Sequence, residues 1–95
     1  MPVIGVLTIE LRVEASHSLK DKRHVVKSLK DRLRARFNVA VAEIDGQDSW
    51  QRSVIAAAAI SGDRAQAERL LQSVENEAAS ILGGDLVGTS LEWLE

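Results

Sequence analysis

The stretch from His17 to Asn38 constrains the fold most, because it predicts one long amphipathic helix with a signal at each end. Ser18 is a good N-cap, and Asp21 follows three residues later, as in a short version of the capping box. The apolar positions then recur at helical spacing: Val25, Val26, Leu29 and Leu33. Phe37 ends this apolar stripe, and Asn38 favours the left-handed conformation that closes a helix.

Strands are predicted on both sides of this helix. From Val3 to Val13 the odd positions are apolar or glycine, while the even positions change from apolar to charged. Four alanines lie within residues 53–60, but the length and the Val and Ile ends of that segment favour a strand over a helix. The predicted strands are Val3–Val13, Val39–Ile44, Ser53–Ile60 and Leu86–Leu94.

A second helix is predicted between the third and fourth strands. Asp63 is placed to cap it, and Gly83-Gly84 is placed to stop it. Its apolar stripe comprises Ala67, Leu70, Leu71, Val74, Ala78 and Ile81.

The resulting order, βαββαβ, predicts a single α+β domain over residues 1–95. Right-handed crossovers would place both helices on one face of a four-stranded antiparallel sheet, which is the ferredoxin-like sandwich. We expect one core cluster containing Leu7, Ile9, Leu29, Leu33, Leu70 and Val74. No helix is left to cover the other face, where Ile4 and Val6 lie beside the alanine-rich third strand. We therefore expect a homodimer built on that face or on a sheet edge.

The charge is unevenly distributed along the chain. The formal net charge is −2, yet residues 20–36 hold eight Lys and Arg and two acids, a net of +6, so the remainder sums to −8. The sequence has no cysteine, which excludes disulfides and thiolate metal sites. No apolar run approaches the roughly 18 residues of a membrane span, and no signal peptide is recognised, so we expect a cytoplasmic protein without a membrane partner.

The cations of the first helix are the candidate nucleic-acid-binding residues: Lys20, Lys22, Arg23, Lys27, Lys30 and Arg34. The alternative is a solvated helix face that acids elsewhere in the fold balance. Only three aromatic residues occur, Phe37, Trp50 and Trp93. Because recognition of bases by a sheet requires aromatic platforms, RNA contacts are expected from the helix to backbone phosphates.

Three further residues allow more than one interpretation. Lys22 shares the helical angle of the apolar stripe, so its stem is expected to pack on the core with the ammonium at the solvent rim, the alternative being an ion pair with Glu43. His17 has no carboxylate, cysteine or second histidine at a recognised spacing, so no catalytic residue, metal ligand or cofactor site is predicted. Trp50 is expected to anchor the hairpin on the core, the alternative being a contact with a partner.

The motif His17-Ser18-Leu19-Lys20-Asp21-Lys22-Arg23, followed by Phe37-Asn38-Val39 and Ala42-Glu43, resembles the YlxP-like family of small bacterial proteins. The resemblance covers nearly the whole chain and implies a ferredoxin-like fold. Genes of that family often lie among genes for translation initiation and ribosome maturation, which implies association with RNA or the ribosome. The family has no established activity, so the resemblance implies no mechanism.

We therefore predict a small non-enzymatic binding module that contacts RNA or the ribosome through its first helix. The alternative is an oligomerising structural or regulatory module that uses the uncovered sheet face. No small-molecule substrate is indicated.

Overall fold

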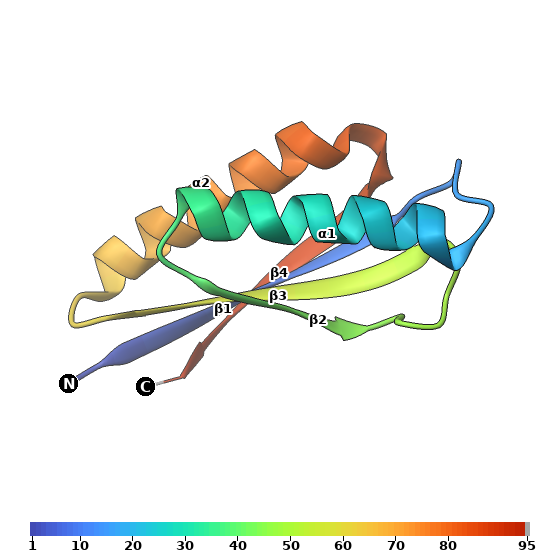
Figure 1. Cartoon of the computed structure of the whole chain (residues 1–95). Coiled ribbons are helices and arrows are strands. Elements are labelled where there is room, and N and C mark those ends of the chain that lie inside the picture. Colours follow the sequence, from blue (N-terminus) through green and yellow to red (C-terminus); the bar gives the residue numbers. More distant parts are fainter. Residues whose placement is uncertain (95) are drawn as a thin grey trace.

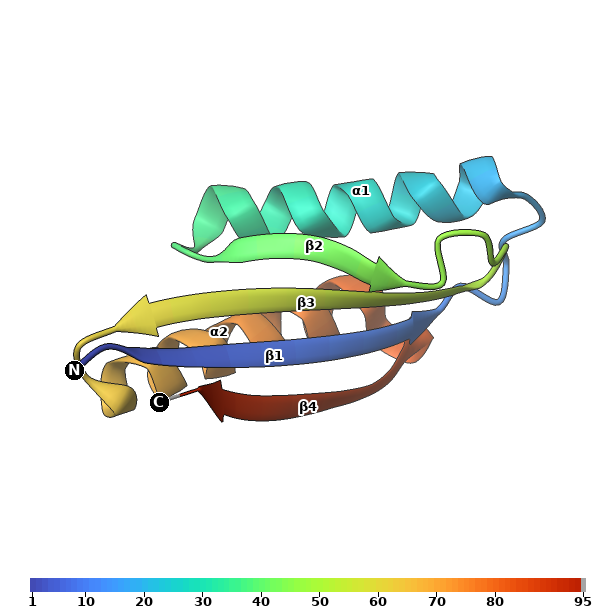
Figure 2. The same ribbon diagram turned by 90° about the horizontal axis from the view of Figure 1, so that it is seen from below.

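The computed structural model describes residues 1–94 and has the predicted order βαββαβ. The elements are β1 (Val3–Arg12), α1 (Leu19–Arg36), β2 (Ala40–Asp45), β3 (Arg52–Ser61), α2 (Arg64–Leu82), the short 3-10 helix η1 (Gly83–Asp85) and β4 (Leu86–Leu94). The four strands form one antiparallel sheet in the order β2-β3-β1-β4. Both helices lie on one face of this sheet (Figure 1), and the other face carries no helix (Figure 2). The predicted ferredoxin-like sandwich is confirmed.

The alternation in β1 produces one buried face and one open face. Leu7, Ile9 and Leu11 are at most 3% exposed, whereas the even positions Ile4 to Glu10 are partly exposed. The alanine-rich segment is strand β3, paired along its whole length with β1. Its Ala57 and Ala59 are buried on the helix side, where their small side chains let the two helices approach the sheet.

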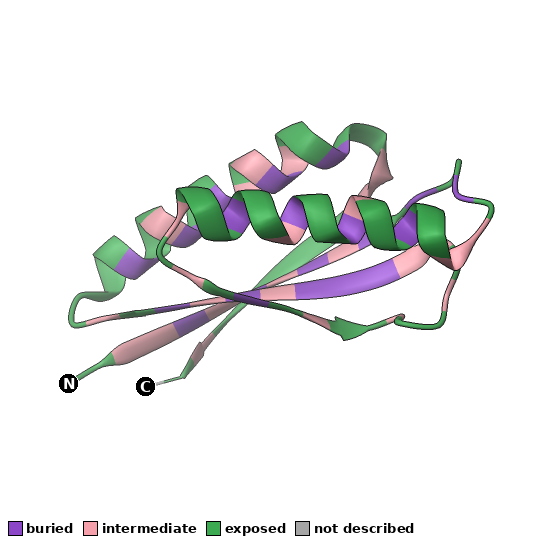
Figure 3. Ribbon diagram, in the orientation of Figure 1, coloured by how far each residue is buried: buried purple, intermediate pink, exposed green. Residues whose placement is uncertain are grey.

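The core lies between the helices and the sheet, with the buried residues of each helix turned toward the strands (Figure 3). The expected cluster of Leu7, Ile9, Leu29, Leu33 and Val74 is confirmed, and these residues are at most 3% exposed. Leu70 packs against the cluster but remains partly buried. In the last turn of α2 the prediction of Ile81 is wrong by one residue: Ile81 is 36% exposed, and Leu82 is buried instead.

The predicted end of α1 is also wrong in its geometry. The helix ends at Arg36, and Phe37 is its C-cap with an extended backbone (φ −130°, ψ 148°). The Phe37 N–H still donates to the carbonyl oxygen of Leu33 at 3.0 Å. No residue other than glycine has a positive φ among residues 1–94, so Asn38 is not a left-handed cap. The chain leaves the helix in an extended form because strand β2 begins at Ala40.

Gly5 makes room for the ring of Trp93 on the neighbouring strand β4. A Cβ at Gly5 would lie 2.5 Å from Leu71 Cδ1 and 2.8 Å from Trp93 Cζ3, and Trp93 is the β4 residue that pairs with Gly5. The Trp93 ring lies on the helix side, under the guanidinium of Arg64 at 4.7 Å from the ring centroid. Trp93 therefore packs against the core and does not contribute its ring to the open face.

Replacing Gly5 with alanine is expected to destabilise the fold by about 1–3 kcal/mol, the usual cost of overpacking a filled core. Gly88→Ala in β4 is the matched control, because a Cβ there has no neighbour within 4 Å. Urea denaturation of the two variants compares the effects. Equal midpoints for both would contradict the close contact of Gly5 with Leu71 and Trp93.

Candidate nucleic-acid interface

The N-terminus of α1 is fixed by its own capping residues, as predicted. The Asp21 N–H donates to Ser18 Oγ at 3.1 Å, and the His17 N–H donates to Asp21 Oδ2 at 3.2 Å. This reciprocal pair of hydrogen bonds resembles the capping box and sets where the helix starts. The position of every later cation on the helix surface follows from this start.

Lys22 is the one cation of α1 that is fully buried. Its side chain has 0% exposure, and its Nζ donates to the carbonyl oxygen of Gly46 at 2.5 Å and to Glu43 Oε2 at 3.4 Å. Two further carbonyl oxygens, of Gln47 and Arg52, lie at 3.4 Å. The expected position of the ammonium at the solvent rim is therefore wrong, and the alternative, an ion pair with Glu43, is what the structure shows.

The loop between β2 and β3 therefore closes around the Lys22 ammonium. Gly46 turns its carbonyl toward Nζ with φ +79°, and a Cβ there would lie 2.6 Å from the carbonyl oxygen of Arg52. Ser53 Oγ donates to the same Glu43 oxygen at 2.5 Å. Because Lys22 is enclosed by these groups, it cannot reach a phosphate. Its prediction as a nucleic-acid-binding residue is therefore wrong.

Four other cations of α1 are held by ion pairs on two sides of the helix. On the side of β2, Lys27 pairs with Asp31 at 2.6 Å and Arg34 approaches the same carboxylate at 3.9 Å. The hydrogen bond from Lys27 is the main cause that lowers the pKa of Asp31. On the side of α2, Arg32 and Arg36 pair with Glu77 at 3.5 and 2.9 Å.

A basic groove runs between α1 and the edge strand β2. It has a volume of about 400 Å³ and is lined by Arg23, Val26, Lys27, Lys30, Asp31, Arg34 and Glu43. Arg34 also spans to the strand, where its Nη2 donates to the carbonyl oxygen of Val41 at 2.8 Å. Within residues 1–94, Arg23 and Lys30 of this groove form no ion pair, and neither does Lys20 one turn earlier. These three cations are available to an external anion.

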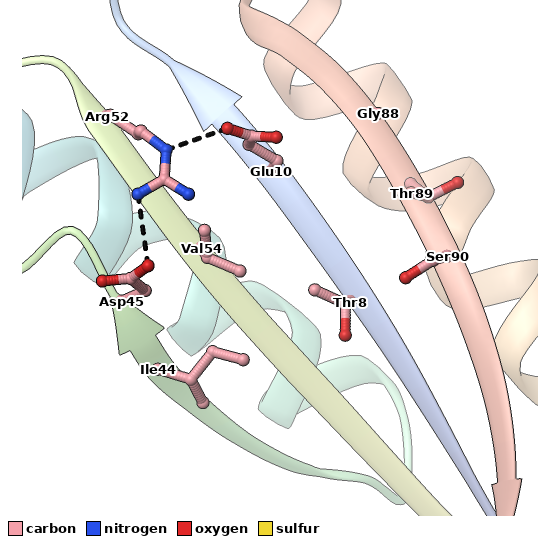
Figure 4. A pocket seen from close by; sticks show the side chains of 9 residues that line it. All are labelled: Thr8, Glu10, Ile44, Asp45, Arg52, Val54, Gly88, Thr89 and Ser90. Carbon is pink, nitrogen blue, oxygen red and sulfur yellow. Dashed lines mark hydrogen bonds and ion pairs between the residues drawn. The ribbon is translucent and has the colours of Figure 1, made fainter.

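A larger hollow of about 560 Å³ lies on the open face of the sheet. The guanidinium in it already forms ion pairs with two carboxylates. Figure 4 shows Arg52 between Glu10 and Asp45, with Nε–Oε2 and Nη1–Oδ2 distances of 2.9 and 3.3 Å. The hydrogen bond to Glu10 is the main cause that raises the pKa of Arg52. The backbone N–H of Gly46 and then Arg52 lower the pKa of Asp45. With its guanidinium occupied by two carboxylates, Arg52 offers no site for an anion.

The remaining motif residues serve the fold or lie at the surface. Phe37 packs against the core, whereas Asn38 and His17 are exposed. Trp50 is 59% exposed in the loop between β2 and β3, so the expected anchoring on the core is wrong.

Among residues 1–94, no three His, Cys, Asp or Glu side chains cluster closely enough to hold a metal ion. None of the helices in the same residues is long and apolar enough to cross a membrane.

Solved structures share the fold of this chain at low sequence identity. A putative antibiotic biosynthesis monooxygenase from Bordetella bronchiseptica aligns with a TM-score of 0.56 and 11% identity, over 100% of this chain and 97% of that one. A dimeric ferredoxin-like protein of unknown function from Thermobifida fusca YX aligns with a TM-score of 0.51 and 18% identity, over 96% and 90% of the two chains. At these identities the similarity concerns the fold alone.

Sequence comparison identifies the family. The uncharacterized protein YlxP of Bacillus subtilis (strain 168) is 42% identical over 72 residues, which are 76% of this chain and 78% of that protein. The family described as "Protein of unknown function (DUF503)" matches residues 4–90. The match includes the capped start of α1, the buried Lys22 with its partners, and the basic groove. The chain therefore belongs to the DUF503 family, as the resemblance to YlxP-like proteins implied.

Proposed function

We propose that this protein is a non-enzymatic module that binds RNA through the sugar–phosphate backbone, using the basic groove and Lys20. The observation that carries the proposal is the line of four cations in one groove, Arg23, Lys27, Lys30 and Arg34. The larger hollow on the open face holds one cation between two carboxylates and offers no comparable attraction for phosphate. Localised charge of this kind creates a field that the net charge of −2 conceals.

The spacing of these cations favours a polymer over a single phosphate group. Arg23 and Arg34 are eleven residues apart on one helix, about 16 Å at the usual rise per residue. A line of this length can contact several successive phosphates of one strand. A single phosphate group would contact only the cations at one end of it. The choice of RNA rests on the resemblance described above, which connects the family with translation.

The mode of binding follows from the side chains at hand. Trp93 is the one aromatic residue on the strands within residues 1–94, and it lies on the helix side of the sheet under Arg64, so these strands offer no ring on the open face for a base to stack on. Cations that contact phosphates carry no direct information about base sequence. Binding is therefore expected to depend strongly on salt and weakly on sequence.

The test is a salt titration of binding to single-stranded ribosomal RNA fragments. If four of the five cations, Lys20 and the four of the groove, contact phosphates, log affinity should fall with log salt at a slope of about −3. Arg23→Gln/Lys30→Gln removes two unpaired cations from the groove and should reduce the slope to about −1.5. Both side chains lie outside the core, so the fold should be retained.

The matched control is Arg32→Gln/Arg36→Gln, which removes two charges from the same helix on the side that faces Glu77. This variant should bind with nearly the slope of the parent protein. Equal slopes for the two double variants would show that the groove is not the contact surface. No binding by the parent protein at low salt would refute the proposal, and a parallel titration with single-stranded DNA tests the preference for RNA.

A further inference from the structure

The open face of the sheet has one end that is mostly apolar, with Glu92 on the edge strand β4 as its one acid within residues 1–94, and an opposite end that is charged. Its side chains alternate with the buried ones, so the strand register places Ile4 beside both Ile60 and Leu94, and Val6 beside Ala58. Ile60 is 69% exposed and Leu94 is 56% exposed. At the opposite end the same face carries Glu10, Asp45 and Arg52. On β1, Ile4 and Glu10 mark these ends, and small side chains such as Thr8 and Ala56 lie between them.

This face has the dimensions of a stable protein–protein interface. Four strands at about 4.8 Å spacing, with up to ten residues at about 3.3 Å, give a flat footprint of roughly 600 Å². Side chains raise the accessible area above the flat footprint, which brings it near the ~800 Å² per partner of a standard interface. Neither helix contributes to covering it (Figure 2).

We propose that a second copy of this chain covers the open face, in a two-fold symmetric dimer with sheet packed on sheet. The sheet order β2-β3-β1-β4 makes the face complementary to itself. A two-fold axis parallel to the strands, between β3 and β1, places β3 of one copy over β1 of the other. Ile60 then meets Ile4 of the second copy, and the small Ala58 meets the larger Val6.

The charged end is compatible with the same arrangement. In this register Arg52 of one copy faces Arg12 of the second copy. Each guanidinium already has acidic partners, Glu10 and Asp45 for Arg52 and Glu14 for Arg12, so the end carries both signs. The opposite orientation would place these charges under Ile60 and Leu94, which offer no polar group to replace the water that is lost. In the proposed dimer the helices of both copies remain on the outside, so the interface does not involve the basic groove.

Sedimentation equilibrium of the full chain from about 1 to 200 µM tests the dimer, and it does not depend on RNA. We expect the parent protein to be dimeric at the upper concentrations. Ile60→Lys places a charge at the apolar end and should weaken association by at least about tenfold, a change of roughly 1.4 kcal/mol. Leu94→Lys should have the same effect and decides the outcome if the first variant does not fold.

The matched control is Ile81→Lys, which changes an apolar residue that is 36% exposed on α2, on the other side of the sheet. It should leave association unchanged. A monomeric parent protein at 200 µM would overturn the proposal. Dimers that persist in both Ile60→Lys and Leu94→Lys would also overturn it, since they would indicate pairing through a sheet edge or a helix.

Discussion

Replacing Lys22 with methionine is expected to lower the free energy of unfolding by about 3–5 kcal/mol, as loss of one partner from a buried ion pair usually does. Methionine keeps most of the stem volume but removes the ammonium. Glu43 then retains only Ser53 among these donors, and the carbonyl oxygen of Gly46 loses the ammonium at 2.5 Å and keeps only the Ser49 N–H at 3.0 Å. A domain of this size is stable by about 5–15 kcal/mol, so the loss is a large share of the total.

Urea denaturation followed by circular dichroism measures the effect, with Lys20→Met as the matched control. Lys20 lies two residues earlier on the exposed side of the same helix turn, so the control makes the same chemical change without a buried partner. It should shift the free energy of unfolding by less than about 0.5 kcal/mol. A loss below 1 kcal/mol for Lys22→Met would show that the enclosed ammonium contributes little.

The double variant Lys22→Met/Glu43→Leu tests whether the two residues act as a pair. Removing both charges eliminates the uncompensated carboxylate, so the combined loss should be smaller than the sum of the single losses. The difference gives the coupling energy. Additive losses would mean that Lys22 acts through the loop carbonyls alone and that Glu43 is incidental.

Periodicity was sufficient to predict the first strand and both helices, because burial requires only that apolar residues recur on one face, whereas the alanine-rich third strand was predicted from its length and its Val and Ile ends. The period of two in β1 and the period of 3.6 in α1 each identify the side that meets the core. The helix start was predictable for another local reason, since Ser18 and Asp21 satisfy backbone groups within one turn.

The enclosure of Lys22 could be predicted only in part. Its helical angle indicated the core, and Glu43 stood out as a charge among apolar strand neighbours. The decisive partners, however, are the carbonyls of Gly46, Gln47 and Arg52, which lie 24 to 30 residues along the chain. Every residue has a carbonyl oxygen, so no residue type reveals which ones will surround an ammonium.

The same limit applies to the basic face of α1. The pair of Lys27 with Asp31 follows from i,i+4 spacing and was accessible from the sequence. The pairs of Arg32 and Arg36 with Glu77 depend on how α2 packs beside α1, which the pattern does not specify. Tertiary packing therefore decides which cations of α1 form ion pairs within the protein and which remain free to bind an external anion.

Replacing Leu29 with alanine is expected to cost about 2–5 kcal/mol, because the leucine has 0% exposure and its removal leaves a cavity between α1 and the sheet. Leu91→Ala is the matched control: it deletes the same atoms from a side chain that is already 41% exposed. The control should cost about 1 kcal/mol, since much of that surface already contacts water and no closed cavity forms. Urea denaturation gives both values, and an unchanged m-value would show that the denatured states are comparable. Equal losses at the two positions, or a loss below 0.5 kcal/mol for Leu29→Ala, would mean that α1 packs on the sheet through a different face. In that case the line of cations would not lie along the edge of β2, and the basic groove would not exist between α1 and β2.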